Sequence, residues 1–262
     1  MFAEERQSLI ADLLAGAGRV RVADLASHFD VTPETVRKDL SAMEEAGQLR
    51  RVHGGAVATD MQSTFEPSLD ERQTQNRDEK SRIAAAALAL IPASRTGSIL
   101  LDSGSTTEQL AELLVDWKPA SAGDQLLVIT NALPIAYKLS RNEEIQLHIL
   151  GGLVRGLTSA VVGAGTIDQL EALRPDIAFI GTNGVDASFG FSTPDAVEAA
   201  VKSAIVRSAR RVVALADSSK LDQETLVRFA ALSEIDTLIT NQLPSPELSA
   251  ALAAADVEVV IA

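Results

Sequence analysis

The spacing of hydrophobic residues in the first part of the chain predicts three helices followed by a short hairpin. The helical segments are Glu4–Ala15, Val22–Phe29 and Pro33–Ala46, and Leu49–Gly55 has the pattern of a basic strand and turn. Only a short turn separates the second helix from the third, which is the arrangement of a helix-turn-helix motif. An ordinary helical hairpin with a loop after it has the same spacing, so the pattern alone leaves both interpretations open.

The third helix has the features of a helix that contacts the major groove of DNA. Thr32 is a favourable N-cap, and Pro33 occupies the first helical position, where its missing N–H costs nothing. Val36, Leu40 and Met43 lie on one face and are expected to point inward, which leaves short polar and basic side chains on the outer face. The basic hairpin is suited to follow the phosphate backbone. The candidate DNA-binding residues are Arg21, Thr32, Pro33, Thr35, Arg37, Lys38, Ser41, Arg50, Arg51, His53, Gly54 and Gly55.

Beyond residue 92, short apolar runs alternate with helical patterns. The expected strands are Ser98–Leu101, Leu126–Thr130, Ile145–Leu150, Ile177–Ile180, Arg211–Ala216, Thr237–Thr240 and Val257–Ile261. The expected helices are Thr106–Val115, Leu133–Leu139, Thr166–Leu173, Asp195–Ala209 and Pro246–Ala254. This alternation predicts an α/β domain with a largely parallel sheet and helices on both of its faces. Ligands are expected just past the carboxyl ends of the strands.

The stretch between these two parts has a different character. Residues 58–70 have little apolar periodicity, and a helical pattern returns from Asp70 to Leu90 before Pro92 ends it. We therefore expect a DNA-binding domain over residues 1–57, a linker over residues 58–75, and a ligand-binding and self-associating domain over residues 76–262.

Composition narrows the functional classes. The 262 residues are 46% hydrophobic, which is enough for a large core and one or two domains. The chain has no cysteine, so disulfides, thiolate metal sites and cysteine nucleophiles are excluded. It also has no signal-peptide pattern and no apolar run of about 20 residues, and we expect a cytoplasmic protein without membrane contact. The three histidines, His28, His53 and His148, fall in different elements, so neither a metal site nor a serine triad is expected.

The net charge of −13 is distributed unevenly along the chain. Residues 1–57 contain 7 basic and 9 acidic residues, a net charge of −2, and the remainder carries −11. An acidic protein is repelled by DNA at long range. Affinity for DNA must therefore come from local cations such as Arg37, Lys38 and Arg51, and we expect self-association to double that patch.

Polar loops follow five of the predicted strands. The first loop, Asp102–Thr107, opens directly into a helix, and its hydroxyl groups lie beside free backbone N–H groups, an arrangement that suits a phosphate monoester or another anion. Ordinary helix capping uses the same residues. A single loop of this kind is often turn chemistry, but five at one edge of a sheet favour a ligand site. The candidate effector-binding residues are Asp102, Ser103, Gly104, Ser105, Thr106, Thr107, Thr130, Asn131, Gly151, Gly152, Arg155, Gly181, Asn183, Glu198, Lys202, Asp217 and Lys220.

Two of these candidates, Glu198 and Lys202, are four residues apart on one predicted helix. This spacing is also that of a surface ion pair that stabilises a helix by a few tenths of a kcal/mol. The alternative is that both side chains contact hydroxyl groups of the ligand. Arg155 is a candidate partner for a phosphate or carboxylate.

Together these motifs resemble the DeoR family of transcriptional repressors over nearly the full length of the chain. The first part shares the helix-turn-helix, the ETVRKDL helix and the RRVHGGA segment, and the second part shares DSGSTT, the TN pair, GGLVR, the Glu198/Lys202 pair and DSSK. Two positions depart from the usual family pattern. Lys38 stands where arginine is usual and lacks its bidentate fork, and Ala132 stands where many members have a serine hydroxyl.

The resemblance implies a winged helix-turn-helix domain and a sensor domain similar to ribose-5-phosphate isomerase that binds a phosphorylated sugar without turning it over. It implies a homodimer or homotetramer on double-stranded operator DNA, with no cofactor. Within the family, the chain most resembles actinobacterial repressors of genes for fructose and other phosphotransferase-system sugars, so fructose 1-phosphate is the expected effector. The expected phosphate site is Asp102–Thr107 with Arg155 and Lys220, and the expected hydroxyl contacts are Asp102, Asn131, Glu198, Lys202 and Asp217.

Two alternatives remain at this point. A sugar-phosphate isomerase-like enzyme would use acidic and basic groups at the strand ends as general acid and base, but it has no need of a helix-turn-helix. A constitutive DNA-binding protein would use its second domain for self-association alone.

Overall fold

A computed structural model describes residues 2–17, 19–52, 54–58, 66–91, 97–121 and 124–262. The chain divides into a first unit, Met1–Phe65, and a second unit, Glu66–Ala262. The division after Phe65 lies inside the range expected to be a linker, and the helix α4 (Leu69–Thr74), which belongs to the second unit, also falls in that range.

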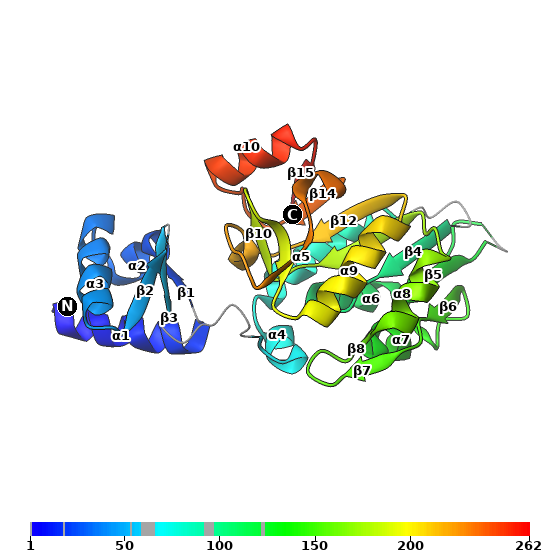
Figure 1. Cartoon of the computed structure of the whole chain (residues 1–262), viewed down its shortest axis with the longest axis horizontal. Coiled ribbons are helices and arrows are strands. Elements are labelled where there is room, and N and C mark those ends of the chain that lie inside the picture. Colours follow the sequence, from blue (N-terminus) through cyan, green and yellow to red (C-terminus); the bar gives the residue numbers. More distant parts are fainter. Residues whose placement is uncertain (1, 18, 53, 59–65, 92–96, 122–123) are drawn as a thin grey trace. The chain divides into compact units, whose positions relative to one another are not determined.

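The described residues of the first unit form three helices and a small antiparallel sheet (Figure 1). The elements are α1 (Ala3–Ala17), β1 (Arg19–Arg21), α2 (Val22–Phe29), α3 (Pro33–Glu45), β2 (Leu49–Val52) and β3 (Gly55–Ala58), and the strand order is β1-β3-β2. The three helices and the hairpin agree with the periodicity. The sequence analysis did not predict β1, because three residues are too few to show a period.

The core of the first unit is made by the inner faces of its helices and by the hairpin. Val36, Leu40 and Met43 of α3 are at most 1% exposed and pack with buried residues of α1, α2 and β2. Between α2 and α3 the chain turns at Asp30, which adopts a left-handed conformation with φ of 52°. Burial of one face of α3 leaves its polar face at the surface.

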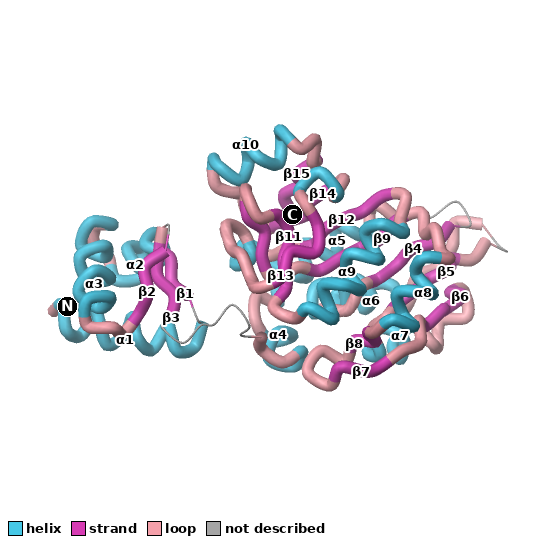
Figure 2. The backbone as a smooth tube through the Cα atoms, in the orientation of Figure 1, coloured by secondary structure: helices cyan, strands magenta, loops and turns pink. Residues whose placement is uncertain are grey.

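The second unit is built on a parallel sheet of seven strands (Figure 2). The strands are β4 (Gly97–Leu101), β5 (Leu126–Thr130), β6 (Ile145–Ile149), β9 (Ile177–Gly181), β12 (Arg211–Leu215), β14 (Thr237–Thr240) and β15 (Glu258–Ile261). Their order is β15-β14-β12-β9-β4-β5-β6, and every neighbouring pair is parallel. The chain runs from β4 toward β6 and then returns to β9, so the order reverses between β4 and β9, where parallel sheets usually bind their ligands.

Helices cover both faces of this sheet. One face packs against α5 (Arg77–Leu88), α6 (Ser105–Leu114) and α7 (Leu133–Leu139), and the other packs against α8 (Ala164–Glu171), α9 (Ala196–Ser208) and α10 (Pro246–Ala254). The strand side chains alternate between the two cores: Leu100 belongs to one cluster, and Ile99 and Leu101 belong to the other. None of the helices in the described ranges combines the length and apolarity needed to cross a bilayer.

The structure differs from the predicted elements between residues 70 and 90. The sequence predicted one helical run here, but the structure has two helices, α4 and α5, which meet at Gln75 and Asn76. A capping box at Ser68 begins α4, since Ser68 Oγ accepts from the Glu71 N–H and the Glu71 carboxylate accepts from the Ser68 N–H. Asn76 then adopts a left-handed conformation with φ of 51°, which ends the helical run before α5 starts.

Short strands outside the main sheet were not predicted either. A hairpin consists of β7 (Leu153–Arg155) and β8 (Ala160–Val162), and a three-stranded sheet consists of β10 (Gly184–Asp186), β11 (Gly190–Thr193) and β13 (Val227–Ala230). Two single-turn helices, η1 (Ser218–Lys220) and η2 (Leu232–Glu234), complete the unit as described.

Candidate functional site

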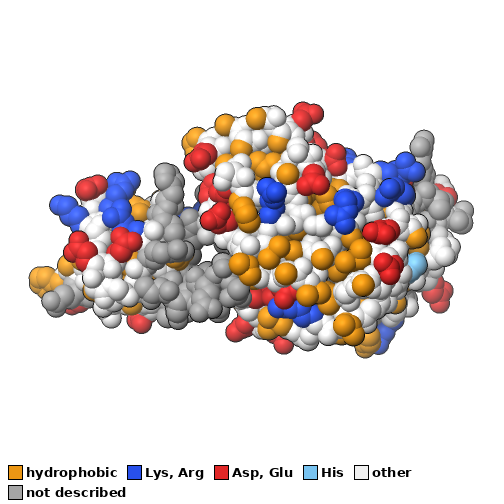
Figure 3. Space-filling model, in the orientation of Figure 1, with side chains coloured by type: hydrophobic (Ala, Val, Ile, Leu, Met, Phe, Trp, Pro, Cys, Tyr) orange, Lys and Arg blue, Asp and Glu red, His pale blue; other side chains and the backbone are white. Residues whose placement is uncertain are grey.

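The outer face of α3 carries polar and basic side chains that the sequence predicts to contact DNA. Lys and Arg side chains gather over α3 in Figure 3, with acidic side chains beside them. An open depression on this face is lined by Glu34, Arg37, Lys38, Ser41, Ala42, Glu45 and Arg51. Residues of the helix and of the hairpin therefore share one surface.

Arg51 connects the hairpin to α3. Its guanidinium donates to Ser41 Oγ (2.7 Å), and its backbone N–H donates to the Glu44 carboxylate (2.8 Å). Ser41 in turn donates to the carbonyl of Arg37 (2.9 Å), and the half-exposed Arg37 side chain pairs with Glu34 at 3.2 Å. These contacts hold the hairpin at a fixed distance from the helix, and a DNA phosphate has to compete with Glu34 for Arg37.

Asp39 follows Arg37 and Lys38 in sequence but points into the unit instead of toward solvent. Its carboxylate is buried and forms a two-point ion pair with Arg6 of α1, with Nε–Oδ2 at 2.5 Å and Nη2–Oδ1 at 3.0 Å. The hydrogen bond to Asp39 raises the pKa of Arg6. The pair fastens α3 to α1, so Asp39 positions the helix.

Several predicted DNA-binding residues have structural tasks in the first unit. Thr32 caps α3 by accepting from the Thr35 N–H (3.2 Å). Gly54 has φ of 76° at the tip of the hairpin, a conformation that favours glycine. At Gly55 a Cβ atom would lie 2.0 Å from the carbonyl oxygen of Val20, because β1 passes directly against it.

For the remaining predicted DNA-binding residues of this unit, we report only their place in the secondary structure. Pro33 begins α3, Arg21 ends β1 and is half-buried, and the backbone of Arg50 is part of β2. His53 lies outside the described residues. Contact of these residues with DNA stays a prediction.

In the second unit a pocket lies at the carboxyl ends of β4, β9 and β12, where the strand order reverses. Its lining residues are Arg72, Gln75, Asn76, Lys80, Ser103, Gly104, Ser105, Thr106, Gly181, Thr182, Asn183, Glu198, Lys202, Leu215, Ala216, Asp217 and Lys220. Three of the predicted loops, the pair on α9, and the segment that joins α4 to α5 therefore meet here. The described residues contain no cluster of His, Asp and Glu side chains placed to hold a metal ion.

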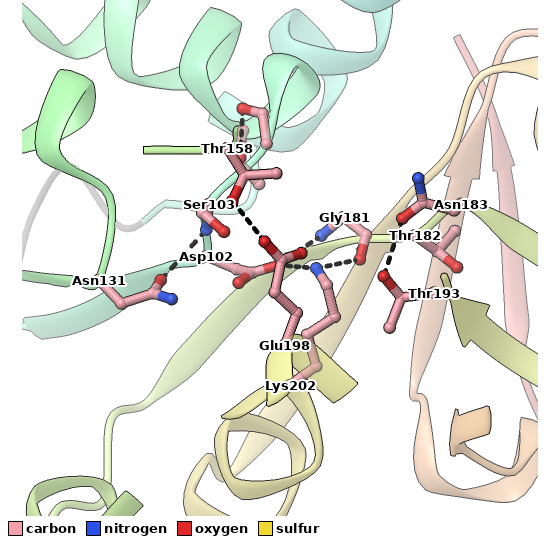
Figure 4. A network of polar contacts seen from close by, with 12 residues as sticks. Asp102, Ser103, Asn131, Thr158, Gly181, Thr182, Asn183, Thr193, Glu198 and Lys202 are labelled. Atoms are coloured by element: carbon pink, nitrogen blue, oxygen red, sulfur yellow. Dashed lines mark hydrogen bonds and ion pairs between the residues drawn. The ribbon is translucent and has the colours of Figure 1, made fainter. Parts of the chain in front are cut away.

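A buried ion pair between Lys202 and Asp102 lies beside this pocket (Figure 4). Lys202 Nζ contacts Asp102 Oδ2 and donates to the carbonyl of Gly181 (2.9 Å), and the Gly181 N–H donates to Asp102 Oδ2 (3.3 Å). Burial raises the pKa of Asp102, and the Lys202 ammonium offsets part of this effect. Within the described structure the other oxygen, Oδ1, is buried without a hydrogen-bond partner, so it can accept a hydrogen bond from a ligand hydroxyl.

Glu198, the other charged residue on α9, contacts residues from the β7–β8 hairpin. Its Oε1 accepts from the hydroxyl of Thr158 and from Arg155 Nη1 (3.2 Å). Arg155 also pairs with Glu66 (2.7 Å) and with Asp195 (3.4 Å). Arg155 thus faces three carboxylates and does not line the pocket, so its predicted contact with a phosphate is not supported by its position.

Three further cations, Arg72, Lys80 and Lys220, give the pocket its positive character. Lys80 is 4% exposed, and its Nζ donates to the backbone carbonyls of Arg72 (2.5 Å) and Gln75 (2.7 Å). Burial lowers the pKa of Lys80 to about 8, and the nearby Asp217 opposes the shift. These cations lie with the first turn of α6, whose N–H groups have no acceptor within the helix. Cations beside a helix N-terminus favour a bound anion.

Asp217 provides a negative charge on the same side. Its Oδ1 accepts from Asn76 Nδ2 (3.0 Å) and from the N–H and hydroxyl of Ser219. Burial works against its charged form, but Lys220 and Ser219 outweigh burial and lower the pKa of Asp217. It is therefore an ionised acceptor that suits a sugar hydroxyl.

Other predicted residues lie behind the pocket and shape the first loop. Asn131 Oδ1 accepts from the backbone N–H of Ser103 (3.1 Å), and Thr107 donates to the carbonyl of Gly104 (2.8 Å). The Thr130 hydroxyl donates to the carbonyl at the end of β4 (2.7 Å). These residues position the loop, and direct contact with a ligand stays a prediction for them.

Gly151 and Gly152 lie against α8, away from the pocket lining. The carbonyl of Gly151 accepts from the side chains of Thr166 and Gln169 (both 3.0 Å). A Cβ atom at Gly152 would lie 2.2 Å from Thr166 Oγ1, so close packing accounts for this glycine.

One wall of the pocket was not predicted from the sequence; it is formed by Arg72, Gln75, Asn76 and Lys80. Only Lys80 gave a detectable signal. It precedes the buried residues Ile83, Ala84 and Ala87 by three, four and seven positions, so it lies on the apolar stripe of α5. A lysine on such a stripe needs buried partners, here two backbone carbonyls.

A helix-turn-helix unit joined to an α/β unit with a pocket at its strand ends is the arrangement expected of a ligand-responsive transcriptional regulator. Residues 6–62 match the DeoR-like helix-turn-helix domain, and residues 75–242 match the DeoR C terminal sensor domain. The chain belongs to the DeoR family of transcriptional regulators, as its motifs predicted.

Curated relatives match along most of their own length. The uncharacterized HTH-type transcriptional regulator FruR of Bacillus subtilis is 33% identical over 92% of this chain and 92% of its own. The glycerol-3-phosphate regulon repressor of Escherichia coli is 30% identical over 92% and 91%, and the HTH-type transcriptional repressor GlcR of Bacillus subtilis is 31% identical over 94% and 91%. The chain is thus a regulator and not an enzyme.

Solved structures match part of the chain. Ribose 5-phosphate isomerase A from Methanocaldococcus jannaschii has 21% identity and a TM-score of 0.40 over 56% of this chain and 55% of its own. The probable sor operon regulator from Shigella flexneri has 12% identity and a TM-score of 0.43 over 71% and 91%. The predicted fold class, a helix-turn-helix domain followed by an α/β sensor domain, is confirmed by the family domains and by the structure.

Proposed function

We propose that this chain represses genes of sugar uptake and catabolism and that a phosphorylated sugar releases it from operator DNA. The first unit binds the operator through the outer face of α3 and the hairpin. The second unit binds the effector in the pocket at the ends of β4, β9 and β12.

The observation that carries the proposal is the distribution of charge around this pocket. Asp102 neutralises Lys202, which leaves Arg72, Lys80 and Lys220 beside the N-terminus of α6. That group matches the charge of a phosphate, which accepts hydrogen bonds from backbone N–H groups and cations.

The pocket also carries acceptors for the hydroxyl groups of a sugar. Asp217, beside the cations, and Glu198 line the pocket, and the unpartnered oxygen of Asp102 lies beside it. The amide of Asn183, another lining residue, is held through Thr193 at 3.1 Å. A polyol with one phosphate satisfies both the cations and these acceptors.

The preferred effector in this proposal is fructose 1-phosphate, on the strength of the sequence resemblance to repressors of fructose and other phosphotransferase-system genes. A phosphorylated effector also agrees with the name of one relative, which is a repressor of a glycerol-3-phosphate regulon. The pocket chemistry supports a phosphorylated polyol as the class of ligand, and the panel described below distinguishes among sugar phosphates.

Self-association as a homodimer or homotetramer is part of the proposal. One first unit offers few cations to DNA, and Arg37 is already paired with Glu34. Two units on a two-fold symmetric operator double the contacts and fix the spacing of the half-sites. Sedimentation equilibrium of the free protein and of its DNA complex measures the number of copies.

The test is the affinity for promoter DNA of neighbouring sugar-transport genes, measured by fluorescence anisotropy with and without a panel of ligands. The panel is fructose 1-phosphate, fructose 6-phosphate, glucose 6-phosphate, glycerol 3-phosphate, free fructose and inorganic phosphate. We expect one sugar phosphate to weaken DNA binding by about fivefold or more, the lower end of ordinary coupling. Free fructose should have no effect, since it has no group for the cationic side.

Lys220→Ala and Lys118→Ala form a matched pair of variants for this experiment. Lys220 lines the pocket, whereas Lys118 is exposed and outside it, and both changes remove one positive charge. Lys220→Ala should weaken effector binding about tenfold or more, because hydrogen bonds to charged groups contribute about 1.5–3 kcal/mol. Equal loss in both variants, or no response of wild-type protein to any sugar phosphate, contradicts the proposal.

A further inference from the structure

The pocket of the second unit is nearly filled by its own side chains. Its free space is about 30 Å³, which is room for two or three water molecules at roughly 10–15 Å³ each. Pockets that hold small-molecule ligands measure about 300–1,000 Å³. A sugar phosphate therefore binds only if part of the wall moves.

Most of the wall belongs to the core of the unit. The loops after β4, β9 and β12 are fixed to the sheet, and α6 and α9 are buried in the two hydrophobic clusters. The remaining part is the segment from Glu66 to Asn76, which contributes Arg72, Gln75 and Asn76 to the pocket. Within the short helix α4, Leu69 is the buried hydrophobic residue. The segment is thus the wall with the smallest apolar anchorage.

Polar contacts hold this segment in place. Arg72 and Gln75 offer their carbonyls to Lys80, Asn76 donates to Asp217 (3.0 Å), and Gln73 donates to Glu108 (2.7 Å). Two of these partners, Lys80 and Asp217, are themselves pocket residues. A ligand that engages Lys80 or Asp217 competes directly with the contacts of the segment.

Glu66, the first residue of the second unit, is held by two arginines. Its side chain is 2% exposed, lies 2.7 Å from Arg155 and 3.8 Å from Arg72, and neither carboxylate oxygen accepts a well-directed hydrogen bond within the described structure. Burial raises the pKa of Glu66, and Glu198 adds to the shift. The Nε of Arg72 is likewise buried without an acceptor. A better partner for Arg72 therefore competes with Glu66. The Glu66 carboxylate is then left with Arg155, a guanidinium that it shares with Glu198 and Asp195.

We infer that the segment Glu66–Asn76 transmits effector binding to the DNA-binding unit, and that Arg72 exchanges the Glu66 carboxylate for the phosphate of the ligand. This inference rests on the proposed function, because it requires an anionic ligand in the pocket. Glu66 follows directly after the first unit, so release of Glu66 changes where the chain leaves the second unit. Entry of the ligand and release of Glu66 are then one event. The coupling free energy between them equals the difference in ligand affinity between the forms with Glu66 held and with Glu66 released.

The test uses the full chain and two variants, Glu66→Gln and Asp70→Asn. Both remove one negative charge from the same segment, but Glu66 is buried in the ion pairs and Asp70 is exposed. The measurements are the dissociation constant for fructose 1-phosphate by calorimetry, or for whichever sugar phosphate of the panel acts on wild-type protein, and the operator affinity with and without it.

In Glu66→Gln the ion pairs with Arg155 and Arg72 are already lost, so the ligand should bind several-fold more tightly and change operator affinity by less than twofold. Asp70→Asn should match wild type in both measurements. Full wild-type coupling in Glu66→Gln overturns the inference and leaves the proposed function intact. Absence of any ligand effect on the wild-type protein overturns both.

Hydrogen exchange of the wild-type protein gives a second readout that does not depend on a variant. Saturating ligand should speed exchange of the backbone amides of residues 66–76 while it slows exchange in the loop after β4. Slower exchange in both segments indicates that the segment Glu66–Asn76 closes over the ligand while Glu66 stays in place, and that result overturns the inference.

Discussion

The buried ammonium of Lys80 should make binding of the proposed effector depend on pH. Burial lowers the pKa of Lys80 to about 8 in the free protein. A bound phosphate favours the charged lysine and raises that pKa, so binding takes up a proton whenever Lys80 is neutral beforehand. Affinity is therefore full below pH 8 and falls as pH rises above 8.

The magnitude follows from the pKa of about 8 for Lys80. Half of the lysines are neutral at pH 8, so each ligand bound takes up about 0.5 proton there. Between pH 7 and pH 9 the dissociation constant should rise about tenfold, and the logarithm of affinity should approach a slope of about −1 per pH unit. The ligand contributes nothing to this slope, because the second pKa of a phosphate ester is about 6 and the ester stays a dianion across the range.

Calorimetric titration from pH 7 to pH 9.5 measures both quantities, because buffers with different ionisation enthalpies report the protons taken up. Asp217 faces Lys80 and stays ionised throughout, since its pKa is lowered. The variant Lys80→Met should bind weakly and without pH dependence, and the exposed control Lys118→Met should keep the wild-type profile. A wild-type affinity that is flat between pH 7 and pH 9 refutes the assignment of Lys80 to the phosphate site.

Three further predictions concern the ion pairs and the DNA-binding face. Arg37→Ala should weaken operator binding by about 1–3 kcal/mol, the worth of a bidentate base contact, and leave calorimetric effector binding unchanged; an unchanged footprint contradicts it. Asp39→Ala removes the buried two-point ion pair with Arg6 and should lower the free energy of unfolding of the first unit by about 2–3 kcal/mol, measured by circular dichroism in urea; a loss of stability confined to the second unit argues against it. Asp102→Asn deprives the buried Lys202 of its counter-charge and should lower the stability of the second unit by about 3–5 kcal/mol; a second change, Lys202→Met, should recover part of the loss, and further destabilisation by it disproves the argument.

The regular elements were predictable where one face of a helix or strand is buried along its whole length. Leu126–Thr130, Leu133–Leu139 and Thr237–Thr240 have the bounds that the sequence predicted, because their apolar spacing directly reflects burial. The break between α4 and α5 was missed, since the polar residues around Asn76 include no glycine or proline that would mark the left-handed turn. The strands β10 and β11 escaped because they are only three and four residues long, and β13 escaped because it pairs over long range, as Ala230 does with Phe191.

The candidate site was predictable to the extent that parallel strands bring their ends together. The loops after β4, β9 and β12 meet as expected, since the sheet fixes them at one edge. The position of Arg155 depends instead on Glu66, a residue that is 89 positions earlier in sequence and whose carboxylate lies 2.7 Å away. No local pattern reveals such a pair. The wall formed by Arg72 and Asn76 was hidden for the same reason, because it comes from a segment with no strand of its own.

The net negative charge of the chain affects both of its proposed anion-binding sites. A net charge of −13 opposes both of the anions that the protein is proposed to bind. In the pocket, the carboxylate of Asp102 neutralises Lys202, and the remaining cations lie beside the N-terminus of α6. On the first unit, Glu34 and Glu45 border the same depression as Arg37 and Lys38, so DNA gains little from nonspecific attraction. In the proposed function, each anion binds only where it replaces a carboxylate of the protein beside a cation, namely Glu66 beside Arg72 and Glu34 beside Arg37. We expect selectivity in both sites to follow from this competition between the protein's own carboxylates and the bound anion. The excess of negative charge strengthens the competition.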